Sequence, residues 1–218
     1  RDERGKEMPE TDKIFSILDE TFPNARCELE FGSVFELLVA VILSAQCTDR
    51  RVNVVTRELF KTADTPEAFA AMKQEELEKA IYSCGFYRNK AKNIIAAAKA
   101  ITERGGEVPN SFDELLKLPG VGRKTANVVY DVGFGGDGIP VDTHVFRVSN
   151  RLGIAPGKTP REVEDKLLEI IPEGNRNRAH HQLIFLGRYR CKAISPQCDD
   201  CPLNEYCNYF HDKRGNLK

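Results

Sequence analysis

Four cysteines lie close together near the end of the chain, in the spacing Cys191-x6-Cys198-x2-Cys201-x5-Cys207. Thiolates this close in sequence suit one metal centre, either a structural zinc ion or an iron–sulfur cluster. Four-cysteine zinc sites usually combine two Cys-x-x-Cys pairs, and only Cys198 and Cys201 form such a pair here. The longer gaps suit the more widely spaced corners of a four-iron cluster. The spacing therefore favours a cluster and leaves zinc open.

Disulfide formation is the third use of these cysteines that has to be weighed. The chain holds seven cysteines, an odd number, and its first ten residues are charged and do not follow a signal-peptide pattern. We therefore expect a reduced, intracellular protein, in the cytoplasm or nucleoid if the source is a prokaryote. The other three cysteines, Cys27, Cys47 and Cys84, are expected to be buried or partly buried thiols.

A second group with chemical potential is the glycine-rich segment Leu118-Pro-Gly-Val-Gly-Arg-Lys124. Gly120 and Gly122 permit positive φ angles and leave the turn without side chains, so backbone N–H groups can reach an anion at the start of the next helix. Arg123 and Lys124 then fall in a first helical turn, where a cation is unfavourable by roughly 0.3–1 kcal/mol. Two such residues in succession indicate a functional site. Either both cations hold phosphate, or one of them does chemistry.

In the chemical alternative Lys124 is the nucleophile, because the helix dipole and the neighbouring guanidinium favour its neutral amine. Asp142, in the segment Val141-Asp-Thr-His144, supplies a carboxylate to complete the pair. As the N-cap of a helix, Asp142 would accept backbone N–H bonds and stay ionised and firmly placed. Such a carboxylate could both activate an amine and stabilise a cationic transition state.

Helical periodicity predicts the elements that must position these groups. Helix start signals occur at Ser33 with Glu36, Thr65-Pro66, Ser111 with Glu114, and Thr159-Pro160. Apolar residues recur at helical spacing near residues 12–22, 34–43, 49–61, 74–83, 88–104, 123–134, 143–152 and 176–189. No alternating strand of convincing length is present. We predict an all-α fold with two helical lobes and short loops.

Composition and charge narrow the class of protein. The chain has 218 residues, is 41% hydrophobic and 30% charged, and carries a net charge of −1. No apolar run approaches the roughly 20 residues that a membrane span needs, so no membrane partner is expected. One stretch is strongly basic and lacks acidic residues: 174–198, with Arg176, Arg178, Arg188, Arg190 and Lys192. This stretch is either a face that follows phosphates or an unevenly charged solvated surface.

Taken in this order and spacing, the glycine-rich segment, the Val141–His144 segment and the four-cysteine tail resemble the endonuclease III family of DNA base-excision repair enzymes. Two further segments add to the resemblance. Leu43-Ser-Ala-Gln-Cys-Thr-Asp49 is similar to the family's segment at the lesion, and Gly85-Phe-Tyr87 is similar to its wedge loop. The resemblance spans most of the chain.

The resemblance implies an all-α fold in which a DNA-binding cleft separates two lobes. A six-helix barrel domain would occupy residues 27–136, with a helix-hairpin-helix near 112–134. A discontinuous domain would comprise 1–26 and 137–218, with an iron–sulfur cluster loop at 191–207. The resemblance further implies a [4Fe–4S] cluster held by Cys191, Cys198, Cys201 and Cys207.

The implied activity is that of a bifunctional DNA glycosylase and apurinic/apyrimidinic (AP) lyase acting on oxidised pyrimidines in duplex DNA. The damaged base is flipped out, Lys124 attacks the sugar C1′ with help from Asp142, and the resulting Schiff base leads to β-elimination 3′ to the lesion. Flipping costs a few kcal/mol, and less where damage has weakened stacking.

The implied partner is double-stranded DNA containing damaged pyrimidines or abasic sites, bound by a monomer. Gln46 is expected to plug the vacated stack, and a monovalent cation to bind the carbonyls of the hairpin when DNA is present. The residues expected to contact DNA are Gln46, Asp49, Phe86, Gly120, Gly122, Arg123, Thr143, His144, Arg147 and Lys192.

The chain departs from the family pattern at the wedge position, where leucine is common and Phe86 stands here. A phenyl ring can stack on an orphaned base more broadly, by about 1 kcal/mol or more. Three rival functions are an adenine-specific mismatch glycosylase, a DNA-binding module without enzyme activity, and an iron–sulfur electron carrier. Lys124 disfavours the first, and the hairpin would be without purpose in the third.

Overall fold

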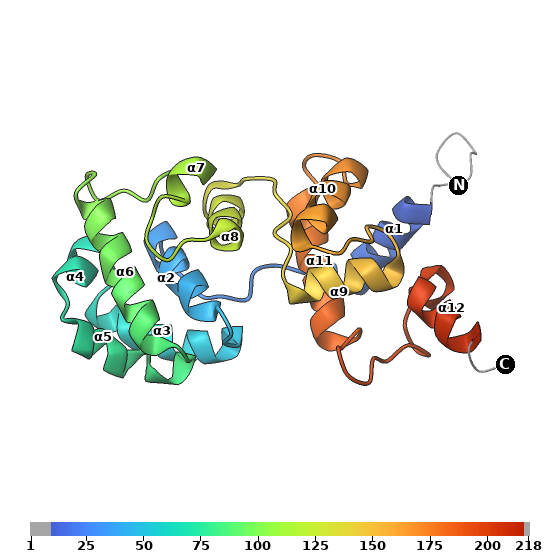
Figure 1. Cartoon of the computed structure of the whole chain (residues 1–218), viewed down its shortest axis with the longest axis horizontal. Coiled ribbons are helices and arrows are strands. Elements are labelled where there is room, and N and C mark those ends of the chain that lie inside the picture. The colour runs from blue at the N-terminus through green and yellow to red at the C-terminus, as the bar shows by residue number, and fades with distance from the viewer. Residues whose placement is uncertain (1–9, 216–218) are drawn as a thin grey trace. The chain divides into compact units, whose positions relative to one another are not determined.

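The computed structural model describes residues 10–215, and these divide into two compact units (Figure 1). One unit is continuous in sequence, Cys27–Gly136. The other is formed by described residues on both sides of it, 10–26 and 137–215. Residues 10–215 are helical with connecting loops and contain no β-strand, so the all-α prediction is confirmed. No helix among the described residues is long and apolar enough to cross a membrane.

The continuous unit is built around α2 (Val34–Ser44), whose residues from Phe35 to Leu43 are nearly all apolar and buried. A helix that is apolar on all sides must be covered on all sides. Helices α3, α6 and α8 pack against it. The helices of this unit that follow α2 are α3 (Asp49–Thr62), α4 (Pro66–Ala71), α5 (Gln74–Ala80), η1 (Tyr82–Cys84, a 3-10 turn), α6 (Tyr87–Thr102), α7 (Phe112–Leu115) and α8 (Arg123–Phe134).

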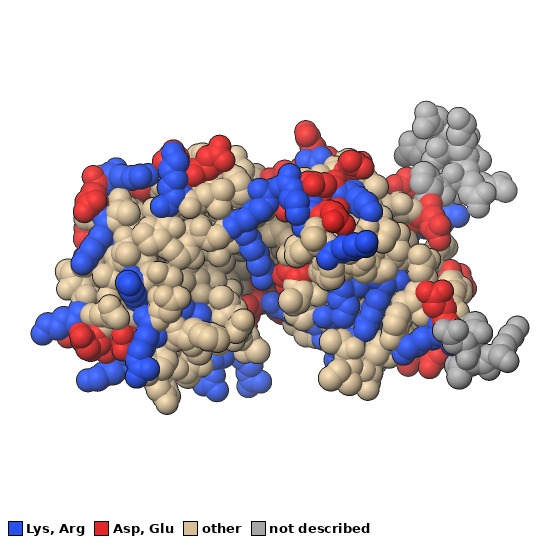
Figure 2. Space-filling view, viewed as in Figure 1, with Lys and Arg blue, Asp and Glu red and all other residues tan. Residues whose placement is uncertain are grey.

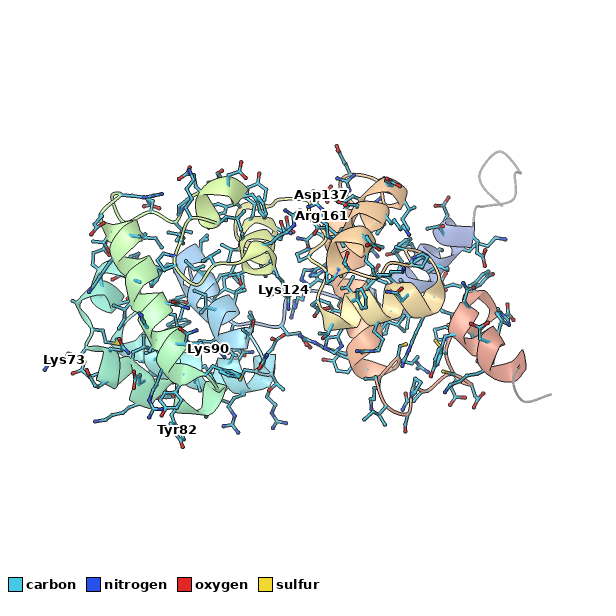
Figure 3. The ribbon with its side chains drawn as sticks, in the orientation of Figure 1. Lys73, Tyr82, Lys90, Lys124, Asp137 and Arg161 are labelled. Carbon is cyan, nitrogen blue, oxygen red and sulfur yellow. The ribbon has the colours of Figure 1, made fainter. Side chains whose placement is uncertain are left out.

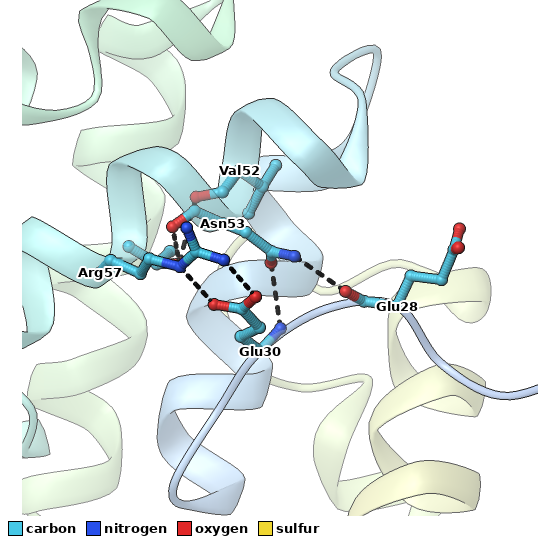
Figure 4. A network of polar contacts seen from close by, with 6 residues as sticks. Glu28, Glu30, Val52, Asn53 and Arg57 are labelled. Atoms are coloured by element: carbon cyan, nitrogen blue, oxygen red, sulfur yellow. Dashed lines mark hydrogen bonds and ion pairs between the residues drawn. The ribbon is translucent and has the colours of Figure 1, made fainter.

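The segment before α2 is fixed to α3 by side-chain hydrogen bonds (Figure 4). Asn53 donates from Nδ2 to the Glu28 carbonyl at 2.8 Å, and its Oδ1 accepts from the Glu30 N–H at 3.0 Å. Arg57 donates from Nε to the Glu30 carboxylate at 2.6 Å, and this pair lowers the pKa of Glu30. The Asn53 amide thus satisfies one backbone donor and one backbone acceptor of a segment that has no regular secondary structure.

The discontinuous unit has its own apolar core, formed by α1 (Glu10–Thr21), α9 (Thr143–Leu152), α10 (Pro160–Ile170) and α11 (Arg176–Tyr189). The core includes Ile14 and Leu18 of α1, which packs against α11 although the two are far apart in sequence. The four-cysteine segment follows α11 and includes η2 (Asn204–Tyr206). The chain then continues into α12 (Asn208–Gly215), which packs against α9.

The helix start signals are largely confirmed, with informative exceptions. Ser33 and Thr159 accept from backbone N–H groups three residues on, at 3.1 and 3.2 Å. Ser111 makes no such bond at the start of the short α7. The predicted helix at 74–83 ends at Ala80, and the chain tightens into η1 before the left-handed residues Gly85 and Phe86.

Candidate functional site

The glycine-rich segment forms a tight hairpin between α7 and α8, closed by a bond from the Val121 N–H to the Leu118 carbonyl at 3.1 Å. Gly120 adopts φ +74°, and a Cβ there would lie 2.6 Å from Cβ of Asn93 on α6. Gly122 has ordinary φ and open space around it. The first glycine is therefore required by the fold. The second leaves the helix N-terminus uncovered, as an anion site needs.

Lys124 is the second residue of α8, directly after the Gly122 N-cap and Arg123. Its side chain is exposed, and it projects from α8 away from the body of the unit (Figure 3). The guanidinium of Arg123 lies 5.2 Å from the ring centroid of Phe112 on α7. The two cations thus differ: Arg123 packs across the hairpin, and Lys124 extends from it.

Asp142 is the N-cap of α9, as predicted. Its Oδ1 accepts from the backbone N–H groups of His144 at 2.9 Å and Val145 at 2.8 Å. The carboxyl group is half-buried. These two backbone bonds fix the rotamer of the Asp142 side chain. Asp142 belongs to the discontinuous unit, whereas Lys124 belongs to the continuous one.

Arg147, expected to contact DNA, is engaged within the protein. It donates from Nε to the Cys191 carbonyl at 3.0 Å and from Nη2 to the Gly187 carbonyl at 2.9 Å. Nη2 also lies 3.1 Å from Nδ1 of His144, whose pKa is lowered by burial and by the neighbouring arginines, against the opposing effect of Asp142. Arg147 therefore ties α9 to the end of α11, and its DNA contact stays a prediction.

The four cysteines Cys191, Cys198, Cys201 and Cys207 line one pocket beside α9 and α11. Within the described residues, no three His, Cys, Asp or Glu side chains are placed to hold a single metal ion. Four thiols that line one pocket are the donor set that an iron–sulfur cluster uses. Burial raises the pKa of the Cys201 and Cys207 thiols, and ligation to a metal centre would favour their thiolate forms.

A second arginine, which the sequence reasoning missed, organises this pocket. Arg151 donates to the carbonyls of Lys192 at 2.7 Å and Ala193 at 3.1 Å, and its Nη1 lies 3.5 Å from Sγ of Cys191. Its guanidinium also stacks over the Tyr209 ring, 4.4 Å from the centroid. Donors near a ligating sulfur tune and orient a metal centre. The helical spacing of Arg147 and Arg151, four residues apart on α9, was the signal that could have found it.

Gln46 and Phe86 lie on two loops of the continuous unit, and both are exposed. Both are non-glycine residues in the left-handed region, with φ of 53° and 46°. Between the loops lies Lys90, whose buried ammonium the sequence reasoning also missed. The signal was its register: Lys90 continues the buried stripe of α6 that includes Ile94, Ala98 and Ile101.

The remaining predicted contact residues occupy starts of helices or the cysteine segment. Asp49 and Thr143 are the first residues of α3 and α9. Lys192 is exposed in the cysteine segment, where its carbonyl accepts from Arg151. Their roles toward DNA stay predictions.

Two family models match the chain. The model of the HhH-GPD superfamily of base excision DNA repair proteins matches residues 39–173, and that of the iron–sulfur binding domain of endonuclease III matches 191–207. The second match covers all four cysteines of the pocket and confirms the [4Fe–4S] cluster over zinc.

Similar proteins cover nearly the whole chain. Endonuclease III of Rickettsia conorii is 54% identical over 91% of this chain and 95% of its own length, and that of Escherichia coli (strain K12) is 46% identical over 90% and 94%. Among solved structures, a non-covalent endonuclease III–DNA complex aligns with a TM-score of 0.90 at 47% identity, covering 96% of this chain and 100% of that chain. A trapped endonuclease III–DNA covalent intermediate aligns at 0.89 and 48% identity, covering 95% and 100%.

The all-helical fold, the glycine hairpin that presents Lys124 and the four-cysteine pocket agree with these matches. The chain therefore belongs to the endonuclease III family.

Proposed function

We propose that Lys124 and Asp142 carry out the chemistry of a bifunctional enzyme that removes oxidised pyrimidines from duplex DNA. Membership of the endonuclease III family makes the chain a DNA glycosylase and AP lyase of base excision repair. The assignment of the two residues rests on one observation above all. An exposed lysine follows a bare glycine N-cap, where backbone N–H groups are available to a phosphate beside the reacting sugar.

The first step is substitution at the sugar. The amine of Lys124 forms a bond to C1′ as the bond from C1′ to the base breaks, and the base leaves with a proton. The attack requires the neutral amine, which is the nucleophilic form of a lysine side chain. Asp142, held by two backbone N–H groups, supplies a fixed negative charge that stabilises the developing sugar cation.

The second step is strand cleavage. The covalent adduct opens to an imine between Lys124 and C1′, which makes the C2′ proton acidic. Loss of that proton and departure of the 3′ phosphate break the C3′–O bond, and water then releases Lys124 from the imine. The same amine thus serves both reactions.

DNA contacts are proposed on each unit. In the continuous unit they are the hairpin, Gln46, Asp49 and Phe86. In the discontinuous unit they are Thr143, His144 and Lys192, with Arg147 acting chiefly through the carbonyls that it binds. Cys191, Cys198, Cys201 and Cys207 would hold the iron–sulfur cluster, which would cross-link residues 191–207. Arg151 fixes the carbonyl of Lys192 in this segment. The finer location, at the DNA of a bacterial cell, is proposed from the bacterial source of the similar proteins.

Borohydride trapping tests the assignment, because borohydride reduces the imine to a permanent protein–DNA bond. On duplex DNA containing thymine glycol, Lys124→Ala should lose trapping and strand cleavage by at least about 10³-fold while keeping most of its DNA affinity. The matched control is Lys99→Ala, which removes an exposed lysine of α6 and should leave both unchanged.

Asp142→Asn separates chemistry from helix capping. The amide oxygen can still accept the two backbone bonds, so the melting temperature should hold while base release falls by about 10²-fold or more. If Lys124→Ala lost affinity and its salt dependence but kept the cleavage rate, the hairpin would be a phosphate-binding element and the assignment would be wrong.

A further inference from the structure

The buried lysine of α6 occupies an unusual environment. Lys90 is 6% exposed, and its ammonium donates to three backbone carbonyls: Leu43 at 2.8 Å, Ala45 at 2.7 Å and Cys84 at 2.7 Å. We call this group of three carbonyls around Nζ the carbonyl clamp. An ammonium has three N–H donors, so the clamp uses all of them. None of the three acceptors is a carboxylate.

The carbonyl clamp joins two loops that are distant in sequence. Leu43 lies in the last turn of α2, Ala45 directly follows this helix, and Cys84 is the last residue of η1. Lys90 itself lies on the first turn of α6. In Figure 3 Lys90 lies inside the unit, whereas Tyr82 of η1 projects from its edge. A single side chain therefore fixes the distance between the two loops.

Each loop places a strained residue next to a clamped carbonyl. Ala45, whose carbonyl is held, is followed at once by Gln46 with φ of 53°; Cys84 is followed by Gly85 and then Phe86 with φ of 46°. Left-handed backbone is unfavourable at a non-glycine residue and persists where neighbouring structure enforces it. The clamp supplies that enforcement at both loops, because it fixes the peptide plane before the strained segment.

Both strained residues present their side chains to solvent. Phe86 is 69% exposed and Gln46 is also exposed. Arg50, Arg51 and Arg88, on the helices that follow the loops, are exposed cations, and Figure 2 shows Lys and Arg side chains along the lower edge of this unit. An exposed aromatic ring among cations suits a stack of bases with phosphates on either side.

Burying an ammonium without a carboxylate partner is costly, so Lys90 needs a reason beyond packing. Burial lowers the pKa of Lys90. A nucleophilic role is excluded by geometry, since all three donors are engaged and the side chain is buried. Burial, with a smaller effect of the neighbouring Cys47, raises the pKa of Cys84 to about 11, so the Cys84 thiol stays protonated.

We propose that Lys90 is a positioning residue that, through the carbonyl clamp, holds the Gln46 and Phe86 loops at a fixed spacing, so that both side chains enter the base stack together. The inference rests on the proposed function, in which these loops contact duplex DNA. The ammonium of Lys90 couples the two loops although it contacts neither the DNA nor the reacting sugar.

The test compares two substrates. Base release from a thymine-glycol duplex requires entry into the stack, whereas β-elimination at a preformed abasic site in a single-stranded oligonucleotide does not. Lys90→Met keeps most of the side-chain volume and removes the donors. It should slow base release at least tenfold and change the single-strand reaction less than twofold. Lys92→Met, which replaces an exposed lysine of the same helix, is the matched control and should change neither.

Fluorescence of 2-aminopurine placed opposite the lesion gives a readout that a purely structural role would not move. In a Lys124→Ala background, where no chemistry follows, Lys90→Met should reduce the unstacking signal at saturating protein. Equal losses on both substrates, or an unchanged signal in folded protein, would overturn the proposal.

A second experiment leaves Lys90 in place and so does not depend on whether its variants fold. Gln46→Ala and Phe86→Ala are measured singly and together on the duplex substrate. If the clamp makes the loops enter as one, the double variant should be at least fivefold more active than the product of the single losses predicts. Independent, multiplicative losses would contradict the inference. If the wild type itself failed to trap or cleave either substrate, the proposed function would fail instead.

Discussion

Two lysines near the starts of helices in the same unit have opposite environments. Lys90 of α6 is buried, with every donor satisfied by carbonyls, whereas Lys124 of α8 is exposed beyond a bare glycine cap. A buried ammonium whose three donors are all hydrogen-bonded to carbonyls holds those backbone segments in place. An amine at the exposed start of α8 lies at the surface, where a bound substrate can reach it. The environment of a lysine therefore decides its role, and three sets of substitutions test this contrast.

Truncation of each lysine should separate the two roles in stability. Lys90→Ala leaves three carbonyls without their donor and should lower the free energy of unfolding by about 2–3 kcal/mol. Lys124→Ala should change it by less than about 0.5 kcal/mol, as is usual for surface sites. Urea denaturation followed by circular dichroism measures both. Equal effects would erase the distinction between the two lysines.

Substitution of the two hairpin glycines should likewise separate an effect on stability from an effect on DNA binding. Gly120→Ala combines a left-handed backbone with a Cβ 2.6 Å from Asn93, and should cost about 1–3 kcal/mol. Gly122→Ala meets no atom within 4 Å and should leave thermal stability nearly unchanged. It should instead weaken DNA binding, because a methyl group then covers the N-terminus of α8. Fluorescence anisotropy at fixed salt measures this, and an undiminished affinity would remove Gly122 from the contact set.

The smallest expected effect concerns the exposed wedge. Phe86→Leu should alter stability little because the ring is 69% exposed, yet change stacking on the orphaned base by about 1 kcal/mol. Relative rates of thymine-glycol removal opposite each of the four bases measure the effect. Unchanged ratios would show that the ring does not read the opposite strand.

Much of the fold follows from local sequence signals. Proline at the first helical position and threonine at the N-cap mark the starts of α4 and α10, and glycines end α8 and α9 in the left-handed region. The cysteine spacing indicated the cluster, and Asp142 was expected as an N-cap. These features depend on neighbours within a few residues, so sequence order alone reveals them.

Hydrogen bonds between residues that are far apart in the sequence could not be predicted from the sequence. Lys90 bonds to Leu43, 47 positions away, and Arg151 bonds to Lys192, 41 positions away. Polar side chains aimed at backbone carbonyls carry no pairing signal, because every residue offers the same acceptor. For the same reason Arg147 was expected to contact DNA, and its commitment to Cys191 and Gly187 emerged only in three dimensions.

The continuous unit, Cys27–Gly136, is inserted between the two sequence segments of the other unit. This connectivity determines which unit can fold first during translation. The continuous unit has all its core residues as soon as Gly136 emerges, so it can collapse during translation. Helix α1, which is synthesised before the continuous unit, keeps Ile14 and Leu18 exposed until α11 is synthesised more than a hundred residues later. Maturation of the unit that binds iron and sulfur is therefore expected to be the late and vulnerable phase of biogenesis.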